Sequence, residues 1–268
     1  CDIGGRLARR RGGVGRMNVQ FAIHGVDFYF IEVNPRASRT VPFIAKAVGL
    51  PLVGIASRVM AGATLAELGL TRQPNVPGVF VKAPVFPFQR FPGVDPLLGP
   101  EMKSTGEVMG IGHELGVAFA KAWIATGNRL PLEGTVHDRD KPGLVPVAEG
   151  FAEIGFRLVA TAGTAEYLAR QGFEVEVVNK LPEGRPHVVD HLINGDIDIV
   201  VNTPLGRESH EDDSVIRRTA LKHRIPCITT LSGALAATGG IAAWRRHELD
   251  VRPLQEIYRL EAVAAPGE

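Results

Sequence analysis

The sequence predicts an α/β protein with two parts: an antiparallel hairpin with helices, followed by a doubly wound parallel sheet. Two β-rich runs flank Gly25 near the start, which is the pattern of a hairpin. After residue 127, short β-rich runs alternate with helical stretches, which is typical of parallel βαβ units. The 268 residues are 45% hydrophobic and 22% charged, so disordered and fibrous classes are excluded.

The first part contains three predicted strands and three predicted helices. Residues 1–16 show no readable period, and a long Gly/Pro-rich loop is expected up to Met109. Pro84 favours an edge position for the third strand, because proline cannot donate to a sheet ladder. The predicted strands are 18–24, 27–34 and 79–86, and the predicted helices are 40–48, 51–61 and 114–126.

The second part follows a linker at residues 127–131, so we predict domains at 1–127 and 128–268. Its strands and helices alternate along the chain. The predicted strands are 156–160, 174–178, 197–201 and 227–230, and the predicted helices are 165–171, 186–194, 211–223 and 233–246.

Charge and cysteine content narrow the classes of function. The formal net charge is +1, so the chain has no overall basic field and no nucleic-acid partner is expected. No apolar run has the length of a membrane span, and no membrane partner is expected. Cys1 and Cys227 form no disulfide framework, which suggests a reducing compartment and a cytoplasmic location.

Oxygen-bearing side chains gather at the start of the predicted hairpin. Glu32 and Asn34 are two apart on one strand and therefore share a face. If the hairpin loop has three residues, Gln20 lies opposite Glu32. One carboxylate with two amide oxygens suits a hard cation such as Mg²⁺, and Arg36 and Arg39 suit an anion held beside it. The alternative is an ordinary polar, exposed hairpin face.

Anion-binding residues follow the strands of the second part. Thr161 and Thr164 lie where a strand passes into a helix, whose free N–H groups favour phosphate. Lys180 and Asn202 follow two further strands, and the carboxyl ends of parallel strands meet at one edge. Singly, each residue has an ordinary interpretation, such as a helix cap, a surface charge or a turn residue. Together they predict a phosphate site.

Several long strings resemble the large chain of carbamoyl phosphate synthase. They are Met17-Asn-Val-Gln-Phe-Ala-Ile23, Ile31-Glu-Val-Asn-Pro-Arg-Ala-Ser-Arg-Thr-Val-Pro42, Arg58-Val-Met-Ala-Gly62, Phe91-Pro-Gly-Val-Asp-Pro-Leu-Leu-Gly-Pro-Glu-Met102 and Ser104-Thr-Gly-Glu-Val-Met-Gly110. The first part thus resembles the end of an ATP-grasp domain. The resemblance implies that Gln20, Glu32 and Asn34 hold Mg²⁺ or Mn²⁺ ions that bridge ATP phosphates, and that Arg36 and Arg39 face a phosphorylated substrate.

The second part resembles the methylglyoxal-synthase-like (MGS-like) domain that closes the same large chain. That resemblance implies that Thr161, Thr164, Lys180, Asn202 and Lys141 contact a nucleotide effector such as UMP or IMP. Two departures stand out: Pro204 replaces a threonine that some relatives carry, and the first strand near 132–141 is short or irregular.

The family reaction converts two ATP, bicarbonate and glutamine-derived ammonia into carbamoyl phosphate for arginine and pyrimidine synthesis. The resemblance implies a glutaminase small subunit as partner and an oligomeric full-length enzyme. We expect this chain to correspond to the C-terminal part of the large subunit and to be inactive alone. One alternative is a stand-alone UMP- or IMP-binding module; a weaker one is methylglyoxal synthase, which needs a carboxylate base in the crevice.

Overall fold

The computed structural model describes residues 2–10, 12–74, 76, 78–91, 94–98, 101–131, 135–138, 143–203 and 210–258. The chain forms two compact units, Cys1–Pro77 with Val251–Glu268 and Gly78–Asp250. This spatial division falls earlier than residue 127, because the segment from Gly78 packs within the second unit. The predicted boundary at 127 stays a prediction about domain families.

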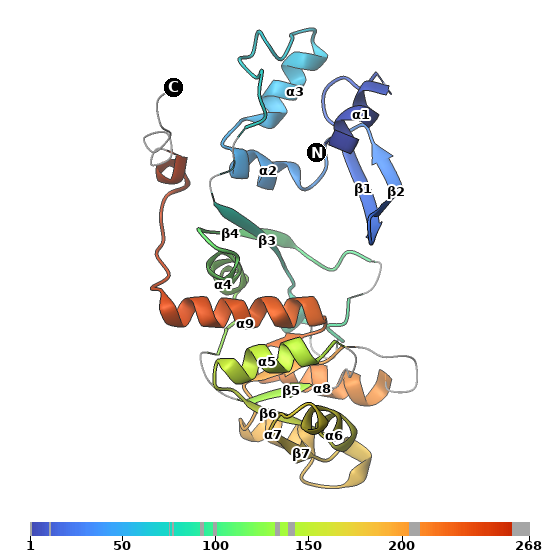
Figure 1. Ribbon diagram of the computed structural model, residues 1–268, viewed down its shortest axis with the longest axis vertical. Helices are drawn as coiled ribbons and strands as arrows, with labels where there is room; N and C mark the ends of the chain where they lie inside the picture. Colours follow the sequence, from blue (N-terminus) through green and yellow to red (C-terminus); the bar gives the residue numbers. More distant parts are fainter. Residues whose placement is uncertain are drawn as a thin grey trace. The chain divides into compact units, whose positions relative to one another are not determined.

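The first unit contains a helix, a hairpin and two further short helices (Figure 1). The predicted hairpin strands and both predicted helices are confirmed, whereas the first helix was missed in a stretch without readable period. Among the described residues no single helix meets the length and hydropathy needed to cross a membrane; α2 and α3 meet them only together, across a 106° bend. The elements are α1 (Asp2–Arg10), β1 (Asn18–His24), β2 (Asp27–Asn34), α2 (Val41–Val48) and α3 (Leu52–Met60).

The β1–β2 hairpin has a shorter loop than predicted and a bulge that compensates for it. His24 pairs with Asp27, so the loop has two residues, not three. The register then shifts between Phe21 and Gln20, and Gln20 pairs with Glu32 as predicted. A regular two-residue hairpin would instead pair Gln20 with Ile31. The bulge therefore moves Glu32 onto the face that carries Gln20.

The second unit begins with an antiparallel pair, β3 (Val79–Val85) and β4 (Gly106–Gly112), against which α4 (Leu115–Ala125) packs. The prediction of a loop up to Met109 was wrong for β4. Its glycines are required by packing: a Cβ on Gly110 would lie 1.9 Å from the Ala118 carbonyl oxygen and 2.5 Å from the Ala122 nitrogen. Glycine lets this strand approach the helix backbone directly.

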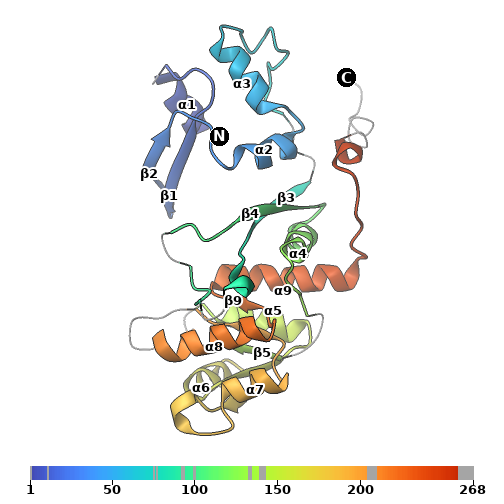
Figure 2. The same cartoon turned by 180° about the vertical axis from the view of Figure 1, so that it is seen from behind.

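A five-stranded parallel sheet forms the rest of the second unit, in the order β7-β6-β5-β8-β9 (Figures 1 and 2). The first strand, which was expected to be short or irregular, is short: β5 has four residues and pairs with both β6 and β8 at the centre of the sheet. The strands are β5 (Thr135–Asp138), β6 (Arg157–Thr161), β7 (Val175–Val178), β8 (Ile199–Val201) and β9 (Cys227–Ile228).

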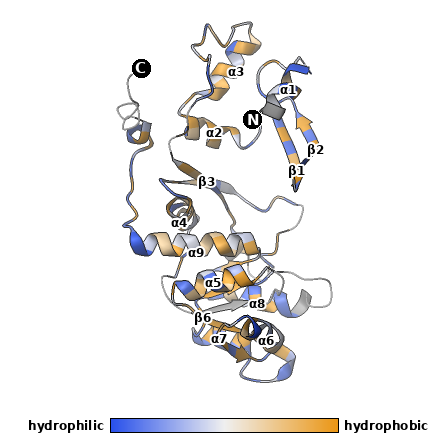
Figure 3. Cartoon of the chain, viewed as in Figure 1, coloured by the Kyte–Doolittle hydropathy of each residue, from blue (hydrophilic) through white to orange (hydrophobic). Residues whose placement is uncertain are grey.

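Helices cover both faces of this sheet, which confirms the doubly wound fold. Four were predicted, and α5 was missed because Pro146 and Gly150 interrupt its pattern. Figure 3 shows hydrophobic residues along α5 and α9 and a hydrophilic C-terminal end on α9. The helices are α5 (Val145–Glu153), α6 (Ala162–Arg170), α7 (Val188–Asn194), α8 (His210–Lys222) and α9 (Leu231–Arg246).

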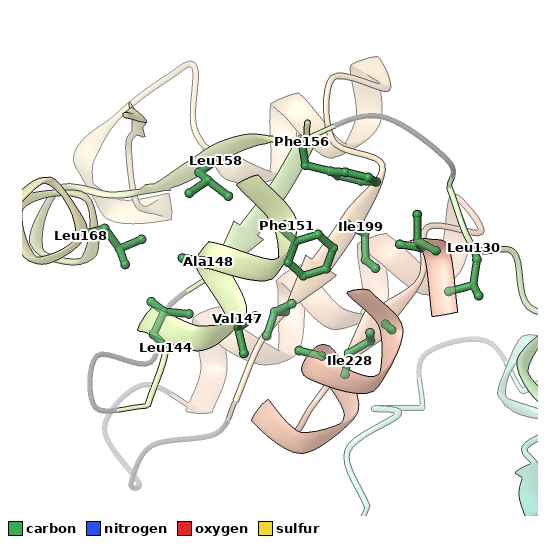
Figure 4. Close-up of a cluster of buried hydrophobic side chains, with 14 of the residues drawn as sticks. Leu130, Leu144, Val147, Ala148, Phe151, Phe156, Leu158, Leu168, Ile199 and Ile228 are labelled. Atoms are coloured by element: carbon green, nitrogen blue, oxygen red, sulfur yellow. The ribbon is translucent and has the colours of Figure 1, made fainter. Parts of the chain in front are cut away.

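The hydrophobic core of the second unit lies on both faces of the five-stranded sheet, because successive residues along a strand point to opposite faces. Leu158 and Ile199 pack with Phe151 of α5 in one cluster, which also receives α6 and α9 (Figure 4). Val159 and Val200 pack with α7 and α8 in the other. Burial on both faces explains why these strands are continuous apolar runs rather than alternating ones.

We expect Gly110→Ala to destabilise the second unit by about 2 kcal/mol or more, because its methyl group would overlap α4 backbone atoms. Urea unfolding followed by circular dichroism measures the change. Gly239→Ala is the matched control, because a Cβ there has open space and sits within α9; it should be neutral or stabilise by about 0.5–1 kcal/mol. Equal losses in both variants would contradict the packing argument.

Candidate functional site

The first candidate site is a cluster of one carboxylate and two amides on the β1–β2 hairpin. Gln20 Nε2 donates to Glu32 Oε1 at 2.6 Å, and Asn34 Nδ2 donates to the same oxygen at 2.8 Å. The structure therefore brings the three predicted residues together. Each amide needs only to turn over to present its oxygen, and the resulting set of one charged and two neutral oxygens fits Mg²⁺ or Mn²⁺.

Arg36 and Arg39 lie directly after this cluster, and both are exposed. The Arg36 backbone N–H donates to the Asn34 carbonyl at 2.8 Å, which turns the chain at the end of β2. The Arg36 guanidinium donates to the neighbouring Ala37 carbonyl at 3.1 Å. An exposed guanidinium held only by a backbone carbonyl can exchange that contact for a phosphate or carboxylate.

The second candidate site is the carboxyl edge of the parallel sheet. All five strands run in the same direction, so the segments after β6, β7 and β8 meet at one edge, as predicted. The chain winds outward from β5 to β7 and then crosses to β8, so the topological switch point lies between β5 and β8. Ligands of open α/β sheets bind at such points. Lys141 and Pro204 lie outside the described residues.

Hydroxyl groups at this edge are buried. Thr161 is the N-cap residue of α6, has an extended backbone and is 5% exposed, and Thr164 in the first turn of α6 is 2% exposed. Thr203 follows β8, and its Oγ1 is buried without a hydrogen-bond partner in the described part of the chain. Sequence reasoning did not single out Thr203, although its position directly after the predicted Asn202 could have indicated it. A buried, unpartnered hydroxyl is suited to receive a polar ligand.

Asn202 is already held by neighbouring side chains. Its Nδ2 donates to Asp213 Oδ1 at 3.2 Å, and its Oδ1 accepts from Arg217 Nη1 at 2.8 Å. Asn202, Asp213 and Arg217 are almost completely buried. The acidic start of α8 thus places Asp213 in the interior. Asn202 can contact a ligand only by exchanging one of these bonds.

Arg217 also binds Asp95, a residue from the segment between β3 and β4. Arg217 Nε and Nη2 donate to the two Asp95 carboxylate oxygens at 2.8 and 2.6 Å. Burial by itself raises the pKa of Asp95, but hydrogen bonds from Arg217, the Leu97 N–H and Ser214 outweigh it and hold the pKa well below its usual range. Neither Asp95 nor Arg217 was predicted, because their pairing spans 122 residues.

The loop after β7 positions Lys180 at the same edge. The Lys180 ammonium is partly exposed and lies 4.0 Å from Glu183 Oε1, while its backbone N–H donates to Glu183 Oε2 at 2.8 Å. His187 then caps α7, where its side chain accepts a hydrogen bond from the Asp190 N–H. Hydrogen bonds from Arg185 and from the His187 N–H hold the pKa of Asp190 well below its usual range. The Lys180 ammonium is thus partly exposed at this edge, with a long ion pair to Glu183 that an anionic ligand could replace.

The second unit has two other features. A cavity of about 400 Å³ opens at the amino ends of β8 and β9, and its lining includes Arg129, Asp198 and Arg224. None of its lining residues is among the predicted site residues. Burial raises the pKa of the Cys227 thiol to about 12, so the thiol is protonated and unreactive at neutral pH.

Asp95→Asn removes the charge that compensates the buried Arg217 guanidinium. We expect it to lower the free energy of unfolding at pH 7 by about 2–4 kcal/mol. Because the folded pKa of Asp95 is lowered, its contribution is complete above the unfolded pKa of about 3.9 and is lost as the pH falls further. The difference in the free energy of unfolding between wild type and Asp95→Asn should therefore shrink below about pH 4. Urea titrations at several pH values measure it.

The control is Asp250→Asn, which removes an exposed ion pair to Lys121 at 2.7 Å. An exposed pair contributes less than about 1 kcal/mol. A similar loss in Asp95→Asn and Asp250→Asn at pH 7 would contradict the role assigned to Asp95.

Comparison with known proteins separates the chain into two matched regions. Residues 5–68 match the family described as "Carbamoyl-phosphate synthase L chain, ATP binding domain", which contains the hairpin cluster. Residues 143–229 match the "MGS-like domain" family, which contains Thr161, Thr164, Lys180 and Asn202. Both matches follow the order predicted from sequence.

Three similar curated proteins carry the name "Carbamoyl phosphate synthase large chain". That of Myxococcus xanthus is 50% identical over 265 residues, which is 97% of this chain and 24% of the relative. That of Rubrobacter xylanophilus is 52% identical over 263 residues, 96% of this chain and 25% of the relative. The relative from Nostoc sp. is 49% identical over 260 residues, 94% of this chain and 24% of the relative.

The chain thus spans about a quarter of the length of these relatives. The matched ATP-binding region comes first and the MGS-like region second. The alignment with the Myxococcus xanthus relative, at 50% identity, includes 97% of this chain. The chain is therefore homologous, over nearly its whole length, to the C-terminal region of carbamoyl phosphate synthase large chains.

Proposed function

We propose that this chain provides the closing part of an ATP site and an effector domain to the large subunit of a glutamine-hydrolysing carbamoyl phosphate synthase. The enzyme would be an ATP-dependent carbon–nitrogen ligase that forms carbamoyl phosphate from two ATP, bicarbonate and ammonia. The observation that carries the proposal is the identity near 50% across almost the whole chain. The convergence of Gln20, Glu32 and Asn34 supports it.

In this proposal Glu32, Gln20 and Asn34 hold Mg²⁺ or Mn²⁺. The ion would neutralise phosphate charge, which is the main requirement of phosphoryl transfer. The hairpin contributes the geometry, because the bulge before Glu32 aligns all three side chains on one face. Arg36 and Arg39 would orient the anionic substrate and stabilise its charge through their guanidinium groups.

The partners belong to the same proposal. A glutaminase small subunit would supply ammonia, the full-length enzyme would be an oligomer, and its location would be cytoplasmic. The isolated chain would be inactive, since it covers about a quarter of its relatives. From net charge we expect no nucleic-acid partner, and from hydropathy no membrane partner.

We further propose that the second part binds a nucleotide monophosphate such as UMP or IMP. Thr161, Thr164 and Thr203 would meet the phosphate and sugar, and Lys180 would pair with the phosphate. Because Asn202 is bonded to Arg217, which in turn holds Asp95, a ligand that draws Asn202 away would disturb the segment leading into β4. This chain of contacts offers a route for regulation.

The stand-alone effector module remains an alternative, because the second unit has its own core on both faces of the sheet. The described residues argue against the methylglyoxal synthase alternative, which needs a free carboxylate base in the crevice. The Asp213 carboxylate accepts a hydrogen bond from the Asn202 amide in the interior. It is therefore not a free base facing the crevice.

A chimera tests the catalytic part of the proposal. When this chain replaces the matching C-terminal region of the Myxococcus xanthus large chain, we expect the reconstituted enzyme to form carbamoyl phosphate. Glu32→Gln in the chimera should lower kcat by about 100-fold or more, because the charged ligand is lost. Asp27→Asn, at the other end of the same hairpin, should change kcat by less than about 2-fold, the effect of an exposed surface substitution. Coupled assays of ATP hydrolysis and carbamoyl phosphate measure both.

The isolated chain is assayed in parallel with ATP, bicarbonate and ammonia, and we expect no turnover. ATP turnover by this chain alone would refute its proposed dependence on the remaining large chain. A chimera whose Glu32→Gln variant retains full activity would refute the metal-binding role.

Calorimetric titration of the chain with UMP and with IMP tests the effector site. We expect one of them to bind, and Thr164→Val to weaken binding by about 10-fold or more through loss of a hydrogen bond to a charged group. Thr105→Val, on the exposed end of the β3–β4 pair, serves as the matched control and should leave the affinity unchanged. If neither UMP nor IMP gave binding heat, the effector role would be refuted.

A further inference from the structure

We propose that His113, Glu114 and His247 form a binding site for a divalent transition metal ion such as Zn²⁺, separate from both candidate sites above. One ligand atom from each residue lies within 4.8 Å of the other two. The two imidazole rings meet edge to face with centroids 5.3 Å apart. His247 Nε2 lies 4.0 Å from Glu114 Oε1.

The three residues come from two places in the second unit that are far apart in the chain. His113 directly follows β4, Glu114 is the N-cap of α4, and His247 is the C-cap of α9. Figure 3 shows that α9 ends in a hydrophilic segment at this point. A bound ion would therefore join the β4–α4 junction to the end of α9.

Close packing of α4 on α9 fixes the backbone positions of these ligands. A Cβ on Gly116 would lie 2.5 Å from the Gly239 carbonyl oxygen, and one on Gly240 would lie 2.9 Å from the Phe119 ring. The junction before α4 is equally tight, since a Cβ on Gly112 would lie 2.8 Å from the Ala118 nitrogen. The ligand backbones are thus held before any ion binds, which lowers the cost of ordering them.

Only side-chain rotation is needed to complete the site. Ligands about 2.0–2.1 Å from a tetrahedral ion are separated by roughly 3.3 Å, which is closer than the present spread. His113 and His247 are exposed and Glu114 is half-buried, so their side chains have room to turn inward. Three protein ligands would leave one position for water.

The donor set selects the class of ion. Two imidazoles and one carboxylate suit Zn²⁺, Co²⁺ or Ni²⁺, whereas Mg²⁺ and Ca²⁺ prefer oxygen ligands alone. The site therefore differs in chemistry from the oxygen cluster at Glu32. Arg246 bears on its strength, because Arg246 Nη2 lies 3.4 Å from Glu114 Oε1. Its positive charge competes with the ion for this carboxylate.

This arrangement predicts opposite effects for two neighbouring substitutions. His247→Asn removes a ligand, whereas Arg246→Gln removes a competing cation next to it. We expect His247→Asn and His113→Asn each to weaken Co²⁺ binding by at least about 10-fold, and Arg246→Gln to strengthen it. His223→Asn, an exposed histidine after α8, is the matched control and should leave binding unchanged.

Co²⁺ binding is measured from its visible absorption bands, and Zn²⁺ binding from the shift in melting temperature of the intact chain. Circular dichroism confirms that each variant is folded. We expect one equivalent of ion and an increase in melting temperature. The proposal is overturned if wild type binds no Co²⁺ at about 100 μM, a weak affinity for a protein site. It is also overturned if the double variant His113→Asn/His247→Asn binds Co²⁺ as wild type does.

Discussion

The buried guanidinium of Arg217 is the constraint on which the second unit depends. Its side chain is 1% exposed, and an isolated charge at such a position would be prohibitively costly. Asp95 supplies the opposite charge, and Asn202 accepts a further hydrogen bond from the guanidinium. The segment between β3 and β4 is therefore tied to the carboxyl edge of the sheet. That tie links the edge where a nucleotide would bind to a part of the chain outside the MGS-like match.

The hairpin cluster depends on a different and more local constraint. Gln20 and Glu32 face each other because the two-residue loop is followed by a bulge at Ile31. Each feature alone would place Glu32 away from Gln20, and the two together restore the alignment. The predicted pairing was thus confirmed although the predicted loop length was wrong. Bulges of this kind commonly re-aim a side chain at functional positions.

Glycine and alanine shape the packing of β4, α4 and α9 within the second unit. β4, α4 and α9 approach one another so closely that side chains at Gly110, Gly112 or Gly116 would meet backbone atoms. The same closeness holds His113 and Glu114 next to His247. Contacts of this kind cannot be inferred from local propensity, because glycine along a chain normally indicates a turn or loop. This is why the second strand of the β3–β4 pair was expected to be a loop.

The sequence by itself determined the fold class, most strands and helices, the family and the convergence of Gln20, Glu32 and Asn34 on the hairpin. Apolar periodicity, two-residue alternation and long matching strings are local signals, and they remain readable without contacts. The tertiary structure alone decided that Asn202 is hydrogen-bonded to Arg217 and Asp213 and that His247 approaches His113. It also decided that the Thr203 hydroxyl has no hydrogen-bond partner among the described residues. Those facts depend on groups brought together over long stretches of chain, whose spacing carries no periodic signal.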